Sequence, residues 1–125
     1  MSVKELIQKI VSSFDHASQG IPIAFKGRNM RIHGIAALLV ICFGLWFTIS
    51  KTEWIVVLML IGLIWSAEMM NTAIENLANV VRDSLGLNYS ATKEPRDIAA
   101  GAVLIMSVIA AITGLIIFYP YLLGK

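Results

Sequence analysis

Three long apolar segments dominate this chain and decide the solvent in which it can fold. Residues 34–50 and 98–124 carry no charge, and residues 54–81 are interrupted only by Glu68 and Glu75. A hydrocarbon core of about 30 Å is crossed by about 20 helical residues. Charged residues make up only 14% of the 125 residues, and hydrophobic ones 58%. We therefore predict an all-α membrane protein in a single domain, 1–125, with transmembrane helices at about 30–50, 53–82 and 96–120.

The segment before these spans is amphipathic. Val3, Leu6, Ile7, Ile10, Val11 and Phe14 recur at helical spacing, and polar residues occupy the opposite face. We expect a surface helix at about 2–18 that lies in the membrane interface and is ended or kinked by the tripeptide at 20–22. Packing on a soluble core is disfavoured because the sequence offers no such core. No cleavable signal peptide is expected, since this polar segment precedes the first apolar one.

Lysine and arginine lie mostly on one side of the predicted spans. The N-terminal segment and the second linker share a side and hold eight of them, whereas the other side holds Lys51 and Lys125. Because such residues accumulate on the cytoplasmic side, we predict a bacterial-type inner-membrane protein with a cytoplasmic N-terminus. The cytoplasmic end of the second span then carries Glu75 and Asn79. A net charge of +2 is too small to indicate a nucleic-acid partner.

Four polar residues follow one face of the second predicted span. Glu68, Asn71, Glu75 and Asn79 are spaced three, four and four residues apart. Because carboxylates are costly in lipid, this face should meet protein or water, and oligomerisation would help to bury it. Such oxygens can hold Mg²⁺ together with substrate phosphates, and the deeper carboxylate can accept a proton from a lipid alcohol. A polar cluster that joins helices, or an ion path, fits the spacing equally well.

Other candidate residues are less specific by themselves. Arg96 and Asp97 begin the third span, where an arginine can bind phosphate oxygens or anchor the helix at the interface. We expect His33 to be an interface residue, because it follows a basic stretch. A single cysteine, Cys42, excludes an internal disulfide. The sequence contains no GxxxxGK[ST] loop, protein-kinase motif set, HExxH or CxxC.

Three motifs occur along the chain: RNMRIH at 28–33, EMMNTAIEN at 68–76 and RDIAAGAVL at 96–104. Together they resemble the motifs of one family, the prokaryotic diacylglycerol kinases and undecaprenol kinases. EMMNTAIEN at 68–76 is similar to its E-x-x-N-T/S-A-I-E signature, and RDIAAGAVL at 96–104 to its K-D-x-A-A-G-A-V-L segment. RNMRIH at 28–33 resembles the R-N-x-x-I-H form that is more typical of the undecaprenol kinase branch. The resemblance implies a homotrimeric membrane kinase that transfers the γ-phosphate of ATP, with Mg²⁺, to a lipid alcohol. Undecaprenol is the favoured acceptor and diacylglycerol the alternative.

The resemblance also assigns roles to individual residues. Glu68 would be the catalytic base and Glu75 the metal ligand. The nucleotide-binding residues that it implies are Asn71, Arg96, Asp97, Lys9 and His16. The residues implied for the lipid substrate are Arg31 and Ala100.

The sequence departs from the family pattern at three positions. Gly27 or Arg28 stands where a second metal-binding glutamate is usual, and neither ligates Mg²⁺. Asn79 replaces a frequent aspartate, and Arg96 replaces the usual lysine. A membrane protein that keeps the fold without catalysis is therefore an alternative. A small ion channel is a third reading, although it would not account for the segments around Arg96 and RNMRIH.

Overall fold

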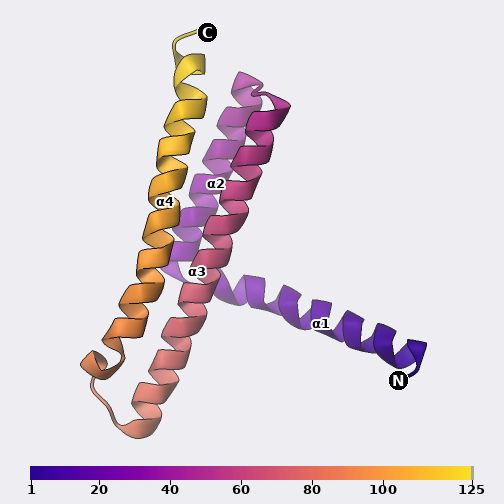
Figure 1. Ribbon diagram of the computed structural model, residues 1–125, viewed down its shortest axis with the longest axis vertical. Helices are drawn as coiled ribbons and strands as arrows, with labels where there is room; N and C mark the ends of the chain where they lie inside the picture. Colours follow the sequence, from indigo (N-terminus) through magenta and orange to yellow (C-terminus); the bar gives the residue numbers. More distant parts are fainter. Residues whose placement is uncertain (125) are drawn as a thin grey trace.

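A computed structural model describes residues 1–124, which form helices and no strand (Figure 1). Three helices, α2 (Arg28–Phe47), α3 (Lys51–Leu85) and α4 (Lys93–Leu122), run lengthwise side by side. Helix α1 (Val3–Ala24) leaves this bundle crosswise, and a short 3₁₀ helix, η1 (Tyr89–Thr92), precedes α4. All three bundle helices are long and apolar enough to cross a membrane. The predictions of an all-α fold and of three candidate spans are confirmed.

The tripeptide at 20–22 does not end α1 as expected. The helix begins at a capping box between Ser2 and Glu5 and continues through Pro22 to Ala24. A proline inside a helix leaves the carbonyl four residues earlier without its N–H partner. Here that carbonyl belongs to Ser18, which is exposed, and only two helical residues follow the proline. The cost of keeping Pro22 in the last turn is therefore small.

The two turns of the bundle are tight. Helix α2 ends at Thr48 in the left-handed region (φ 50°), and α3 starts at a capping box in which Ser50 and Glu53 bond each other's backbone N–H. At the opposite end α3 stops at Gly86, whose φ of 63° favours glycine. Because α3 runs to Leu85 and α4 begins at Lys93, the second linker is shorter than the sequence indicated.

The α2–α3 turn and the end of α4 form a closely packed region, which we call the turn end. Its buried residues are Ile49, Val57 and Ile117, with an aromatic cluster beside them. A Cβ atom on Gly44 would lie 2.7 Å from the Trp54 ring, so only glycine admits this contact. The Tyr121 hydroxyl donates to Glu53 Oε2 at 2.6 Å and joins α4 to α3.

Most large apolar side chains of the bundle point outward. Exposed examples occur on every spanning helix, including Leu38, Met59 and Leu104. Such a surface is stable in lipid and unstable in water. The fold therefore buries little apolar area within one chain and relies on a hydrocarbon solvent.

Candidate functional site

The polar residues of α3 lie where α2 and α4 meet it, at the end of the bundle opposite the turn end. We call this region the polar end. Glu68 and Asn71 are 3% and 4% exposed, whereas Glu75 and Asn79 are half-buried. The prediction that these four residues share one face of the helix is confirmed. A single chain already buries the first two residues, so their burial does not require oligomerisation.

Asn71 has one satisfied and one unsatisfied side-chain atom. Its amide nitrogen donates to Glu75 Oε1 at 3.4 Å. Its Oδ1 atom is buried and has no hydrogen-bond partner among the described residues. An unpaired buried polar atom costs about 1–3 kcal/mol. An oxygen kept at this cost between two carboxylates is available to a ligand.

His33 approaches Glu68 from α2. Its Nε2 atom lies 3.9 Å from Glu68 Oε2, and the side chains are 20% and 4% exposed, respectively. The interface position of His33 stays a prediction, to which the structure adds this contact with the polar face of α3. This contact could not be predicted from the sequence, because it depends on the register of α2 against α3.

Aromatic packing sets that register between α2 and α3. The Trp65 indole N–H donates to the His33 carbonyl at 3.4 Å, and the Phe25 ring packs edge-on against Trp65 at 5.2 Å. A Cβ atom on Gly34 would lie 2.9 Å from the Phe25 ring. Arg31 Nε donates to the Phe25 carbonyl at 2.9 Å and so closes the turn between α1 and α2.

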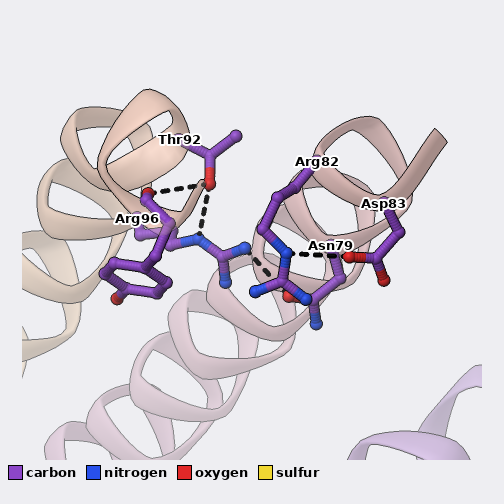
Figure 2. A network of polar contacts seen from close by, with 6 residues as sticks. Asn79, Arg82, Asp83, Thr92 and Arg96 are labelled. Carbon is purple, nitrogen blue, oxygen red and sulfur yellow. Dashed lines mark hydrogen bonds and ion pairs between the residues drawn. The ribbon is translucent and has the colours of Figure 1, made fainter. Parts of the chain in front are cut away.

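Arg96 extends the polar end from α4 (Figure 2). The guanidinium donates to Asn79 Oδ1 at 2.8 Å and to Thr92 Oγ1 at 3.1 Å, and it lies 5.0 Å from the centre of the Tyr89 ring. All three partners are neutral, and Arg96 forms no ion pair within residues 1–124. Its positive charge is therefore fixed in place and not neutralised, which suits an anionic ligand. Figure 2 also shows Arg82 paired separately with Asp83.

The remaining predicted site residues are exposed. Lys9 and His16 lie on α1, Arg31 is in the first turn of α2, and Ala100 is on the outside of α4. Asp97 forms an ion pair with Lys93 one turn before it. No hydrogen bond or ion pair of the described chain joins any of these five predicted residues to the polar face of α3.

The donor set at the polar end is small for a metal. Within residues 1–124, no three His, Cys, Asp or Glu side chains group together as metal ligands. Asn71 and Glu75, one helical turn apart, each offer hard oxygen donors, although it is the Asn71 amide nitrogen that faces the Glu75 carboxylate. Gly27, the N-cap of α2, adds no side-chain donor. This set fits Mg²⁺, which takes one or two protein oxygens and completes its shell with phosphates and water.

Comparisons with known proteins agree with the motifs. Residues 15–118 match the family described as prokaryotic diacylglycerol kinase. The chain is 38% identical over 117 residues to a protein named undecaprenol kinase from Bacillus subtilis, with 93% of each chain covered. It is 30% identical over 122 residues to a diacylglycerol kinase from Synechocystis sp., covering 96% of this chain and 68% of that protein. No solved structure matches it. The predicted resemblance is confirmed, and the chain belongs to the prokaryotic diacylglycerol kinase family of lipid kinases.

Proposed function

We propose that this protein is an ATP-dependent lipid kinase whose acceptor is undecaprenol. The observation that carries the proposal is the buried polar face of α3, with the unpaired Asn71 Oδ1 between Glu68 and Glu75. The 38% identical relative is named for undecaprenol, and the less similar one for diacylglycerol. Diacylglycerol is therefore the second candidate acceptor.

The length of α3 suggests different depths for its two carboxylates. Glu68 follows Trp54, an aromatic residue suited to the opposite interface, by 14 residues, and Glu75 follows it by 21. At about 1.5 Å per residue these separations are about 21 Å and 31 Å, against a hydrocarbon core of about 30 Å. Glu68 would lie inside the inner edge of the core, within reach of a lipid hydroxyl. Glu75 would lie at the aqueous surface, where nucleotide arrives.

This arrangement suits phosphoryl transfer. The hydroxyl oxygen of the lipid attacks the γ-phosphorus, the bond to the β–γ bridging oxygen breaks, and ADP leaves. Glu68 accepts the hydroxyl proton, as a general base does. The chain's other task is to position the phosphates and stabilise their charge, which is most of what such a reaction needs. Asn71 and the fixed charge of Arg96 would serve that purpose.

Glu75, with Asn71 beside it, would hold Mg²⁺. When bound, the ion neutralises phosphate charge and orients the γ-phosphate. The other family-implied roles are part of the proposal. Asp97, Lys9 and His16 would contact nucleotide, and Arg31 and Ala100 the lipid.

The assembly and orientation are proposed on physical grounds. The lysine and arginine distribution supports a cytoplasmic polar end in a bacterial-type inner membrane. Helix α1 leaves the bundle crosswise with its apolar residues exposed, which supports its placement in the membrane interface (Figure 1). The family resemblance favours a homotrimer. Cross-linking in native membranes tests the trimer, because a ladder that stops at three copies is expected.

The direct test supplies purified protein in lipid with Mg²⁺-ATP and separate alcohols: undecaprenol, shorter polyprenols and diacylglycerol. Of these alcohols, undecaprenol should be phosphorylated with the highest kcat/KM. Faster transfer to diacylglycerol would replace the proposed acceptor. Absence of transfer to every alcohol by folded protein would favour a non-catalytic membrane protein of the same fold.

Glu75→Gln should weaken the use of Mg²⁺. The amide lacks the negative charge that attracts the ion. The Mg²⁺ concentration at half-maximal activity should therefore rise by about 10-fold or more. A magnesium titration at saturating ATP measures this shift. Glu94→Gln, at an exposed position of α4, is the matched control and should leave the titration unchanged. An unchanged titration for Glu75→Gln would contradict its role as a metal ligand.

A further inference from the structure

The proposed kinase reaction assigns no role to His33, although this residue contacts the proposed base, Glu68. Glu68 is among the most buried residues of the chain, with its side chain 4% exposed. A buried carboxylate is strongly destabilising unless it is paired. Within the described residues, His33 is the basic side chain within 4 Å of this carboxylate. The Thr72 hydroxyl donates to the backbone carbonyl of Glu68 and not to its carboxylate.

His33 is held at this place from two sides. The Trp65 indole donates to the His33 carbonyl, and Trp65 precedes Glu68 by three residues on the same face of α3. One turn of α3 therefore contacts both the backbone and the side chain of His33. Phe25 packs against Trp65 and limits sliding of α2 along α3.

His33 lies at a boundary between an apolar groove and the polar face of α3. It lines one end of a groove of about 280 Å³ between α2, α3 and α4, whose other walls include Ala37, Val57, Gly114 and Ile117. The side of the ring toward Glu68 is polar, and the side toward the groove is apolar. The carboxylate held by His33 is thus next to the place where an alcohol on an apolar chain would leave the hydrocarbon.

We propose that His33 is a positioning residue for the base. Its Nε2 atom, 3.9 Å from Glu68 Oε2 without substrate, would move within hydrogen-bond distance in the occupied site and keep the flexible glutamate side chain in the rotamer that faces the lipid hydroxyl. The hydroxyl proton still passes to Glu68, and His33 exchanges no proton with the substrate. This inference rests on the proposed kinase function, since it assigns a partner to the proposed base. Its effect should be on the transfer step and not on ATP binding.

Two variants of His33 separate positioning from packing. His33→Leu keeps the volume but removes the donor, and we expect kcat to fall about 10- to 100-fold with little change in the KM for ATP, as for lost partners of reacting groups. His33→Gln keeps an N–H donor and should retain activity within about threefold of wild type. Equal losses in both variants, or no loss in either, would overturn the proposal. In a Glu68→Gln background, His33→Leu should cause no further loss, and a full additional loss would also contradict it.

A spectroscopic test uses neither ATP nor lipid alcohol. The chain has two histidines, so the imidazole ¹⁵N signals of labelled protein in detergent are assigned by comparison with His16→Gln. In Glu68→Leu, the Nε2 signal of His33 should move and that of His16 should stay. An unmoved His33 signal would overturn the contact. If the wild type phosphorylates no alcohol, the kinase proposal fails, whereas this spectrum still decides whether His33 contacts Glu68.

Discussion

The polar groups at the two ends of the helical bundle differ in how completely they are hydrogen-bonded. At the turn end, Glu53 accepts bonds from Tyr121 and from the Ser50 backbone at 2.6 and 2.7 Å. At the polar end, Asn71 Oδ1 has no partner in the described chain and Glu68 is 3.9 Å from its nearest basic group. The same helix, α3, therefore carries a glutamate with short bonds at one end and a glutamate with a loose contact at the other.

This difference separates groups that stabilise the fold from groups that are kept for a ligand. Buried polar groups are normally fully hydrogen-bonded, and those left unsatisfied usually have a functional reason. Variants at the turn end should change the free energy of unfolding and leave phosphate transfer alone. Variants at the polar end should lower phosphate transfer without lowering the free energy of unfolding.

Asn71→Leu should produce the largest contrast. Leucine has the same branched shape as asparagine and removes the unpaired buried oxygen, so the free energy of unfolding should rise by about 1 kcal/mol. Phosphate transfer should fall about 100-fold or more, because a group that positions the reacting phosphate is lost. Denaturation in detergent and a transfer assay measure the two quantities. Lower stability together with full activity would reverse the comparison.

Gly44→Ala should destabilise the turn end. The added methyl would lie 2.7 Å from the Trp54 ring and 3.2 Å from Ile49, both parts of a packed region. We expect a loss of about 1–3 kcal/mol in the free energy of unfolding, with unchanged kcat for the folded protein. Gly62→Ala is the matched control because a Cβ there meets nothing within 4 Å. Equal stability of both variants would show that Trp54 does not pack closely on α2.

Tyr121→Phe should have the smallest effect. It removes the hydrogen bond to Glu53 and keeps the ring near Phe47, so a loss of about 1 kcal/mol is expected from denaturation curves. Tyr119→Phe, at an exposed tyrosine of the same helix, should have no comparable effect. Reduced kcat in Tyr121→Phe would mean that the turn end takes part in transfer.

The sequence predicted those features that depend on local spacing. Apolar length indicated the three spans, and the helical period placed Glu68 and Asn71 on one face, which the structure buries. The family motifs added roles that spacing alone left open. These signals are read along one helix at a time and need no knowledge of how helices pair.

The contacts between helices were beyond such reasoning. The approach of His33 to Glu68 depends on the register of α2 against α3, and the bond from Arg96 to Asn79 depends on that of α4. Such registers depend on particular side chains, such as Trp65 between α3 and α2, whose partners have no fixed spacing in sequence. The sequence did not predict that α1 continues through Pro22, because a proline near a helix end destabilises the helix less than one in its middle.

We assign phosphate transfer to the polar end of α3, with Glu68 as the base. The decisive experiment is Glu68→Gln, with phosphate transfer to undecaprenol and Mg²⁺-ATP binding measured on the same folded preparation. Loss of a general base predicts a decrease in kcat of about 100-fold or more with nucleotide affinity nearly unchanged. A Glu68→Gln variant that keeps most of the wild-type rate would show that Glu68 is not the base.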